Sequence, residues 1–336
     1  MVDPSQEYAL MEEREELMVS LVDEQVMPIF RVAHFLKPTI PSAPKLPFLP
    51  SRSKLCSSSL KVKFGGGVAY MRGWSKWVDK LKPLYQDTWK KAGIFEAILA
   101  STFKIHLHND LIIALAERWC VETNTFIFPW GEGTVTLEDM VVLGGFSILG
   151  RNVLRPVKTK ECVEMERSIR ELYKVVSVYH HAWMEYFEGK SCSDHLEHVA
   201  FLTLWLSRFV FPPKGSQNVH QAVIPIAIHL SRGNSMALAP AVLASIYRDL
   251  NLLNQLIVSS AKHTEHSSNS RCVEDESELI LRSPLHFVQL WAWERFPGLQ
   301  PKPGVIYCGE PRVARWHKVK KLERVDPRCN TPHFSG

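Results

Sequence analysis

Three residues of the segment CSDHLEH are of the types that bind metal ions: Cys192, His195 and His198. A zinc site normally takes its ligands from two chain segments, often with a C-x-x-C pair supplying two of them. The chain has seven cysteines but no C-x-x-C pair. On one helix the first and third candidate would also point in diverging directions. We therefore interpret the segment as a helix start with solvated polar side chains and assign no metal ligand.

Other side chains could exchange protons with a substrate. The candidates are His106, His108, His180, His181, Glu132, Glu138 and Asp139. A general base needs a nucleophile or an orienting partner within reach, and the histidines are more simply explained as surface or cap residues. Asp139 follows Thr136 at the spacing of a capping box, in which each side chain binds a free backbone N–H group. We expect Glu132 to anchor the turn before them by accepting backbone N–H hydrogen bonds.

Motifs for phosphate binding and nucleophilic catalysis are not found. FGGGVAY lacks the Lys-Ser/Thr pair that ends a P-loop, and GEGTVT does not match G-x-G-x-x-G. GGFSILG contains a serine but no nucleophile elbow. We assign no catalytic residue and no cofactor, and we expect the chain not to be an enzyme.

The composition is that of a globular protein. Of 336 residues, 46% are hydrophobic and 22% are charged, and the net charge of +5 permits contact with nucleic acid without demanding it. An odd number of irregularly spaced cysteines argues against a secreted disulfide framework. The acidic N-terminus does not resemble a signal peptide, and no apolar stretch approaches the roughly 18 residues that span a bilayer. We expect no membrane segment and a location in the nucleus, or alternatively in the cytoplasm.

The elements that would position these residues are mostly helices. The pattern predicts a mainly α fold, a compact multi-helix domain with a small β-hairpin near residues 125–136. We expect an N-terminal helix over residues 6–26 and a Pro/Ser-rich linker over residues 37–60, both within residues 1–61. The domain itself is predicted over residues 62–320, with a polar loop at residues 262–278, and a basic tail follows at residues 321–336.

The segment TNTFIFPWGEGTVTLEDM (residues 123–140) predicts a tight corner in the chain. TFIF and TVT are expected to pair as strands, and Thr136 with Asp139 should cap the helix that follows. The turn between the strands consists of Phe128, Pro129, Trp130, Gly131 and Glu132. Trp130 either packs into the body of the domain or is exposed to a partner. We favour packing, because aromatic side chains are more often buried than exposed.

A basic segment, EPRVARWHKVKKLER (residues 310–324), offers a second candidate surface. It could contact phosphate groups, serve as a nuclear import patch or form a solvated helix face, and the solvated face is the default interpretation. The residues that would contact nucleic acid are Arg312, Arg315, Lys318, Lys320 and Lys321.

Several blocks of the sequence resemble the plant mobile domain family, also called aminotransferase-like, which includes the maintenance-of-meristems proteins. They include WKKAGIFEAILAS, LAERWCVETNTFIFPWGEGTVTLEDMVVLGGFSILG, AFLTLWLSRFVFPPK and LHFVQLWAWERFPGLQPKPG, within residues 62–320. The resemblance carries the turn block from Thr123 to Asp139 but no catalytic residue. No lysine sits in the setting that a pyridoxal-phosphate enzyme requires, so we treat the aminotransferase label as a name.

The resemblance implies a function in the nucleus. Family members are linked to transposable elements, gene expression, transposon silencing and meristem maintenance, and some are fused to or partnered with a PP7-type serine/threonine phosphatase. We expect a non-catalytic protein-interaction domain whose protein partner could be such a phosphatase. The alternative is a nucleic-acid-binding module inherited from a transposable element.

Overall fold

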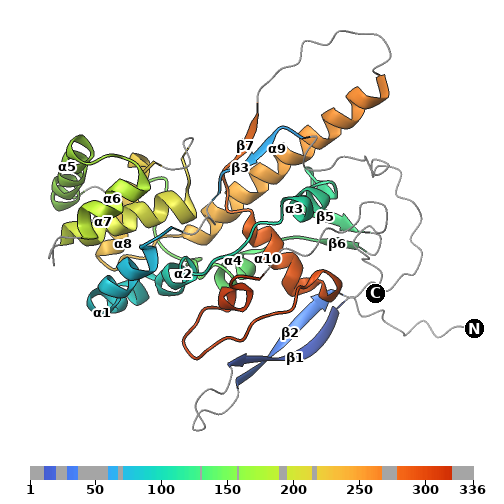
Figure 1. Cartoon of the computed structure of the whole chain (residues 1–336), viewed down its shortest axis with the longest axis horizontal. Helices are drawn as coiled ribbons and strands as arrows, with labels where there is room; N and C mark the ends of the chain where they lie inside the picture. Colours follow the sequence, from blue (N-terminus) through green and yellow to red (C-terminus); the bar gives the residue numbers. More distant parts are fainter. Residues whose placement is uncertain are drawn as a thin grey trace, which may run out of the picture.

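The fold is mainly α-helical, as predicted. The computed structural model describes residues 11–19, 29–36, 60–66, 71–128, 131–156, 159–188, 195–213, 218–266 and 278–319. One group of helices, α5 to α8, lies on the opposite side of the molecule from α3 and the strands β5 and β6 (Figure 1). Helix α1 contacts both α8 and α2, and helix α4 packs on the long helix α9.

The α-helices follow one another through most of the chain. They are α1 (Trp74–Ala92), α2 (Phe95–Ala100), α3 (Asn109–Ala116), α4 (Leu137–Val142), α5 (Lys160–Val175), α6 (His180–Glu188), α7 (His195–Trp205), α8 (Ile224–Ser231), α9 (Leu238–His266) and α10 (His286–Arg295). A π-helical turn, Leu206–Val210, continues α7. Short 3₁₀ turns cover Gln221–Val223, Pro297–Leu299 and Arg312–Trp316. No helix in the described ranges is long and apolar enough to cross a membrane.

The strands are short and form three small sheets. They are β1 (Met11–Val19), β2 (Ile29–Leu36), β3 (Val62–Phe64), β4 (Trp119–Cys120), β5 (Thr125–Phe128), β6 (Gly131–Gly133) and β7 (Leu279–Leu281). β3 pairs with β7 in parallel, and β4, β5 and β6 form an antiparallel sheet in that order.

The predicted hairpin is present but its second strand is displaced. We expected TFIF to pair with residues 134–136, whereas β5 pairs with Gly131–Gly133 directly after a two-residue connection. We did not expect a strand at Gly131–Gly133 because glycine has a low strand propensity. Pairing with the adjacent strand β5 overrides that propensity. Strand β4 adds a third member that the sequence pattern did not indicate.

The predicted N-terminal helix over residues 6–26 is wrong for residues 11–19, which form strand β1. β1 pairs antiparallel with β2, with Met11 opposite Leu36 and Glu16 opposite Arg31. Helix propensity is a weak prior, and residues 29–36, IFRVAHFL, have the β-branched and aromatic composition of a strand that supplies a pairing partner. The other residues of the predicted helix, and most of the linker, lie outside the described ranges.

The predicted polar loop at residues 262–278 begins later than expected, because α9 continues to His266. The lysine and glutamate in this stretch are good helix formers, so the helix needs no apolar face there to continue. Residues 267–277 lie outside the described ranges.

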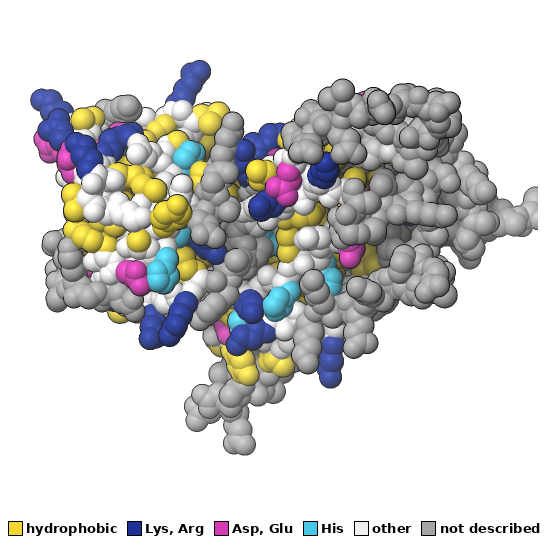
Figure 2. Space-filling view, turned by 45° about the horizontal axis from the view of Figure 1, so that its top comes forward, with side chains coloured by type: hydrophobic (Ala, Val, Ile, Leu, Met, Phe, Trp, Pro, Cys, Tyr) yellow, Lys and Arg dark blue, Asp and Glu magenta, His cyan; other side chains and the backbone are white. Residues whose placement is uncertain are grey.

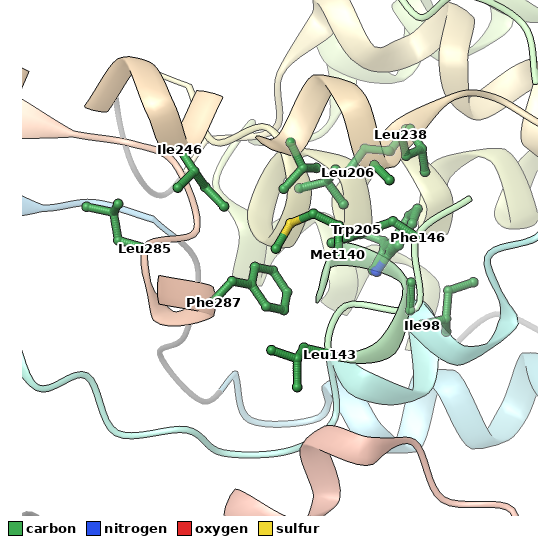
Figure 3. Close-up of a cluster of buried hydrophobic side chains, with 14 of the residues drawn as sticks. Ile98, Met140, Leu143, Phe146, Trp205, Leu206, Leu238, Ile246, Leu285 and Phe287 are labelled. Carbon is green, nitrogen blue, oxygen red and sulfur yellow. The ribbon is translucent and has the colours of Figure 1, made fainter. Parts of the chain in front are cut away.

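Aromatic side chains form much of the core, as their helical spacing indicated. Trp74 stacks on Phe201 with ring centroids 4.8 Å apart, and Trp89 stacks on the same ring at 5.5 Å. Helix α7 is buried at every residue from Glu197 to Trp205. Figure 3 shows how Met140 of α4 and Leu143 directly after it meet side chains of α2, α7, α9 and α10 in one cluster.

Candidate interaction site

The antiparallel sheet β4–β5–β6 is the base of the predicted corner. Phe126 and Phe128 of β5 are buried, and Thr125 and Ile127, which alternate with them, face outward, as a strand requires. Phe126 stacks on Trp291 of α10 with ring centroids 5.1 Å apart, and Phe128 meets Phe296 at 5.2 Å. Tyr247 of α9 donates a hydrogen bond to the carbonyl oxygen of Val135 at 2.6 Å. The corner is therefore held by both α9 and α10.

The turn tip differs from our expectation at Glu132. This residue is exposed and lies opposite Ile127 in the sheet register. Its Oε2 accepts a hydrogen bond from Thr125 Oγ1 at 2.7 Å instead of binding backbone N–H groups. The register explains the change, because it places Glu132 on the outward face of the sheet next to Thr125. Pro129 and Trp130 lie outside the described ranges, so the packing of Trp130 remains a prediction.

Thr136 and Asp139 form a capping box at the start of α4. Asp139 Oδ2 accepts hydrogen bonds from the Thr136 backbone N–H and from Thr136 Oγ1, both at 2.8 Å. The Asp139 N–H in turn donates to Thr136 Oγ1 at 3.4 Å. Asp139 Oδ1 accepts a further hydrogen bond from Arg295 at 2.9 Å, which ties α4 to the end of α10. The buried Asp139 and the exposed Glu132 thus have separate structural partners and do not act as a carboxylate pair.

A glycine lets the chain leave α4 in close contact with α2. Gly145 has a φ of +66°, and a Cβ atom added there would lie 2.5 Å from the backbone nitrogen of Ala97. Phe146 then turns inward and packs edge-on against Phe287 of α10, with ring centroids 5.7 Å apart (Figure 3). The exposed segment begins directly after this close contact between the chain and α2.

Residues 148–155, ILGRNVLR, form a loop that we call the Leu/Arg loop. Its backbone is fixed to residues 235–237, the segment before α9. The Arg151 N–H donates to the Ser235 carbonyl and the Ala237 N–H donates to the Arg151 carbonyl, both at 2.9 Å. Ser235 Oγ donates to the Leu149 carbonyl at 2.7 Å. Gly150 permits this approach, because a Cβ atom there would lie 2.6 Å from Ser235 backbone atoms.

The Leu/Arg loop exposes two leucines that alternate along the chain with two arginines. Leu149 is 80% exposed and Leu154 is 84% exposed. Arg151 and Arg155 are also exposed, and neither forms an ion pair with any residue in the described ranges. Contiguous exposed apolar surface, rather than a single exposed leucine, marks sites that bind other proteins, and here two leucines five positions apart are exposed in one loop. Sequence reasoning missed this loop; its only signal was an aperiodic mixture of apolar and basic residues after the corner.

The candidate histidines are structural within the described ranges. His198 is buried, its Nε2 accepts a hydrogen bond from Trp89 Nε1 at 2.8 Å, and its ring stacks on Tyr85 at 3.8 Å. Because the indole is only a donor, neutral His198 carries its proton on Nδ1. Burial, with a smaller contribution from His195, lowers the pKa of His198 to about 3. Cys192 lies outside the described ranges, and no group of metal-ligating residues occurs within them.

The other candidate histidines also have identified surroundings. Burial lowers the pKa of His180 to about 4, and its Nε2 lies 2.9 Å from the Asn218 carbonyl oxygen. His181 pairs with Glu185 at 3.3 Å on the exposed side of α6. The backbone N–H of His108 donates to Gln289 at 2.7 Å. None of these contacts places a histidine next to a nucleophile.

The basic segment after residue 310 is not a solvated helix face over its first half. Arg312 is buried and forms two hydrogen bonds to Glu294, at 3.0 and 2.8 Å. Arg315 lies 3.9 Å from the same carboxylate, and Trp316 donates to it at 3.0 Å. Burial of the apolar side chains of Val313 and Trp316 places this 3₁₀ turn against the core. Arg312 and Arg315 therefore pair with Glu294 inside the protein. Lys318 is exposed, and Lys320 and Lys321 lie outside the described ranges.

Comparison with known proteins places this architecture in a family. The sequence profile of the plant mobile domain matches residues 93–331. The chain belongs to the plant mobile domain family. The matched range of this plant mobile domain includes the whole corner and the Leu/Arg loop. No solved structure matches the chain.

Three curated relatives of this plant mobile domain come from Arabidopsis thaliana. "Serine/threonine-protein phosphatase 7 long form homolog" is 28% identical over 67% of this chain and 17% of its own length. "Protein MAINTENANCE OF MERISTEMS" is 49% identical over 17% of this chain and 12% of its own length. "Protein MAIN-LIKE 1" is 28% identical over 43% of this chain and 31% of its own length. The chain thus spans less than a third of each of these relatives.

Proposed function

We propose that this plant mobile domain is a non-catalytic protein-interaction domain of the nucleus that binds its partner through the Leu/Arg loop. The observation that carries the proposal is the exposure of Leu149 and Leu154 in one loop, whose backbone is bound to residues 235–237 at Leu149 and Arg151 and turns back on Asn152 at Leu154. Burying two leucine side chains at an interface contributes roughly 1.5–3 kcal/mol each. Because the loop is already ordered, little conformational entropy is lost on binding.

The chemistry of the loop selects an acidic partner with apolar anchors. Arg151 and Arg155 each follow one of the leucines in the chain and can pair with carboxylates of another protein. Arg232 is engaged with Glu161 at 3.3 Å and is less available. Charged groups around an apolar centre favour a particular partner and orientation more than they add affinity.

Other apolar side chains are also exposed and could contact a partner. Figure 2 shows hydrophobic side chains on the side of the molecule that holds α5 to α8. Val175, at the end of α5, is 78% exposed, and Tyr179 before α6 is 59% exposed. A protein partner that covered this region as well would bury an area more typical of a stable complex.

The internal polar groups support a non-catalytic function. Glu197 accepts hydrogen bonds from Trp77 at 2.8 Å and Lys80 at 2.7 Å, and Glu294 is held by Arg312 and Trp316. Asp139 is held by its cap and by Arg295. A catalytic carboxylate must be within reach of a substrate. These three carboxylates are instead hydrogen-bonded to neighbouring side chains inside the protein.

The relatives suggest the biological setting of the interaction. One relative carries a matching region within a chain named as a serine/threonine-protein phosphatase 7 long form homolog. We propose that the partner is a phosphatase of this type, and that the complex acts in gene expression, transposon silencing and meristem maintenance. The name of the relative "Protein MAINTENANCE OF MERISTEMS" supports the last part of this proposal.

The proposal is tested by capturing the phosphatase from plant nuclei at mild salt with the wild-type chain and with Leu149→Ser/Leu154→Ser. The matched control is Leu84→Ser, since Leu84 is 60% exposed on α1 and outside the loop. We expect the phosphatase with the wild type and the control and not with the double variant. Equal recovery of the phosphatase with all three chains would show that the loop does not take part in the interaction. A gel shift with DNA or RNA that disappears at moderate salt would instead support the nucleic-acid alternative.

A further inference from the structure

Two lysines and a histidine meet where the segment after α2 contacts the residues that follow the 3₁₀ turn Arg312–Trp316. The backbone N–H of Lys104 donates to His317 Nδ1 at 2.9 Å, and the Lys318 N–H donates to the Lys104 carbonyl oxygen at 2.8 Å. Phe103 packs edge-on against the imidazole, with ring centroids 5.4 Å apart. These contacts bring together residues 213 positions apart in the chain. We call Lys104, His317 and Lys318 the basic cluster.

The contact with Lys104 decides which imidazole nitrogen of His317 carries the proton. Because Nδ1 accepts a hydrogen bond, the neutral ring has its N–H on Nε2. Burial lowers the pKa of His317, as do the charges of Lys318 and Lys104, whereas Glu310 raises it, so the ring is neutral at pH 7. His317 is half-exposed, and its Nε2 is neither buried nor hydrogen-bonded to any residue that the structure describes. An N–H donor close to two ammonium groups is therefore accessible from solvent.

Lys318 has a backbone conformation that lysine rarely adopts. Its φ is +54°, and the other non-glycine residue with a positive φ in the described part of the chain is Asn124. Asparagine tolerates this region far better than lysine does. Backbone strain of this kind is found most often at functional sites. The Lys318 side chain is exposed and forms no ion pair with a described residue, so no contact of its ammonium group within the fold offsets the strain.

An exposed tyrosine belongs to the same surface. Glu310, whose charge acts on His317, accepts the Tyr307 N–H at 2.9 Å through Oε2 and donates its own N–H to the Tyr307 carbonyl oxygen at 3.0 Å. The Gly304 N–H donates to the Arg315 carbonyl oxygen at 2.7 Å. The loop that carries Tyr307 is thus bound to the turn before the basic cluster. The tyrosine side chain is 50% exposed.

The charges at this surface favour an anionic ligand. Neither Lys104 nor Lys318 forms an ion pair with a described residue, and the carboxylate that acts on His317, Glu310, already binds the Tyr307 N–H. The residues that follow in the chain, 320–336, add more basic than acidic side chains: Lys320, Lys321, Arg324 and Arg328 against Glu323 and Asp326. A long polyanion could therefore extend from the cluster without meeting a net negative charge in this part of the sequence.

We propose that the basic cluster and Tyr307 bind single-stranded nucleic acid. Lys104 and Lys318 pair with backbone phosphates, and His317 donates its Nε2–H to a phosphate oxygen. Tyr307 stacks on an unpaired base. Cationic groups along the backbone combined with an aromatic platform for the bases are the usual elements of such a site. The site shares no residue with the Leu/Arg loop, so either proposal can fail alone.

Fluorescence anisotropy of the full chain at low salt tests the site, with labelled single-stranded DNA and RNA of about 15 nucleotides as probes. A DNA duplex of the same length and oligoglutamate are the comparison ligands. We expect at least one single strand to bind more tightly than both, with an affinity that falls as salt is added. The tighter of the two strands identifies DNA or RNA as the ligand. No binding of either strand, or duplex or oligoglutamate binding as tightly as the better one, would overturn the proposal.

Variants localise the binding. Lys104→Gln/Lys318→Gln should weaken the better strand by about tenfold or more and reduce the salt dependence, because two phosphate contacts are lost. Lys160→Gln/Arg167→Gln removes the same charge from exposed positions of α5 and should change the affinity by less than about twofold. Tyr307→Ala should weaken binding by about fivefold or more, whereas Tyr307→Phe keeps the ring and should bind like the wild type. Equal weakening by the two charge variants would mean that only net charge matters and would contradict the site.

A glycine at position 318 separates function from strain. Glycine adopts a positive φ without steric cost, so Lys318→Gly should melt at a temperature no lower than the wild type while its affinity falls by roughly threefold or more. A lower melting temperature with unchanged affinity would assign Lys318 a structural function and contradict the proposal. Leu149→Ser/Leu154→Ser should bind the single strand as the wild type does, because the Leu/Arg loop lies outside this site.

Discussion

At the scale of single residues, polar side chains that could do chemistry in this sequence are mostly bound inside the fold. Asp139 illustrates why the sequence could predict one part of this and not another. Its capping contact with Thr136 is local, and the spacing of the two residues predicted it. Its ion pair with Arg295 joins positions 156 residues apart, and no local pattern carries that information. The same holds for Arg312, whose partner Glu294 was not predictable from the basic run.

The Asp139 contacts should make a measurable contribution to stability. Replacing Asp139 with Ala removes a cap and the ion pair between Asp139 and Arg295, and we expect the free energy of unfolding to fall by about 3 kcal/mol. Glu138→Ala, at the exposed neighbouring position, should change it by no more than about 0.5 kcal/mol. Urea unfolding of both variants measures the difference. Equal stability of the two would mean that the buried cap contributes little.

Buried histidines should make the fold sensitive to acid. Burial lowers the pKa of His198 and of His286 to about 3, from 6.5 in the unfolded chain. The unfolded state therefore binds protons more readily, and stability is complete above pH 6.5 and is lost as the pH falls below it. Below pH 6.5, and down to the folded-state pKa, each such histidine should lower the free energy of unfolding by about 1.4 kcal/mol for each pH unit.

Unfolding free energies at pH 7.5 and 5.5 test this for His198. His198→Gln retains a hydrogen-bond acceptor for Trp89 but cannot take up the proton, so its loss of stability between the two values should be about 1.4 kcal/mol smaller than that of the wild type. His181→Gln, at an exposed position, should lose as much as the wild type. The same loss in His198→Gln would contradict a buried neutral His198.

At the scale of elements, helices with a clear apolar spacing were predictable and short strands were not. The apolar residues from Trp74 onward predicted α1, because residues on the buried face of a helix recur every three to four positions. Strand β6 is the glycine-rich segment Gly131–Gly133, and β1 is rich in glutamate, so neither has the composition of a strand. Both exist because an adjacent segment pairs with them. The Leu/Arg loop was missed because its order comes from residues 235–237, more than eighty positions later in the chain.

The crossing of α2 by the chain after α4 is an element-scale feature that a single substitution tests. Gly145→Ala places a Cβ atom 2.5 Å from Ala97 N at a φ of +66°, so strain and a backbone clash combine. We expect a loss of about 2–4 kcal/mol in the free energy of unfolding. Gly309→Ala has a similar φ of +80° but meets no atom within 4 Å, and it should lose only about 1 kcal/mol. Thermal and urea unfolding compare them, and equal losses would argue against close packing of α2 on this turn.

At the scale of the whole molecule, the chain is a mainly helical plant mobile domain with a rigid corner and an exposed loop beyond it. The fold class followed from hydrophobic periodicity, and the family followed from the sequence blocks around the corner. The proposed partner surface did not follow from either, since exposure depends on how all the elements pack together. Trp130 at the turn tip remains a prediction of packing into the body.

The central claim is that Leu149 and Leu154 bind a protein partner while the domain stays folded. The most direct measurement is the dissociation constant between the purified chain and the phosphatase, compared for wild type and Leu149→Ser/Leu154→Ser, with melting temperatures recorded for both. Both leucines are largely exposed, so we predict an unchanged melting temperature and an affinity weakened by about a hundredfold or more. An affinity within about twofold of the wild type, in a folded double variant, would contradict the account.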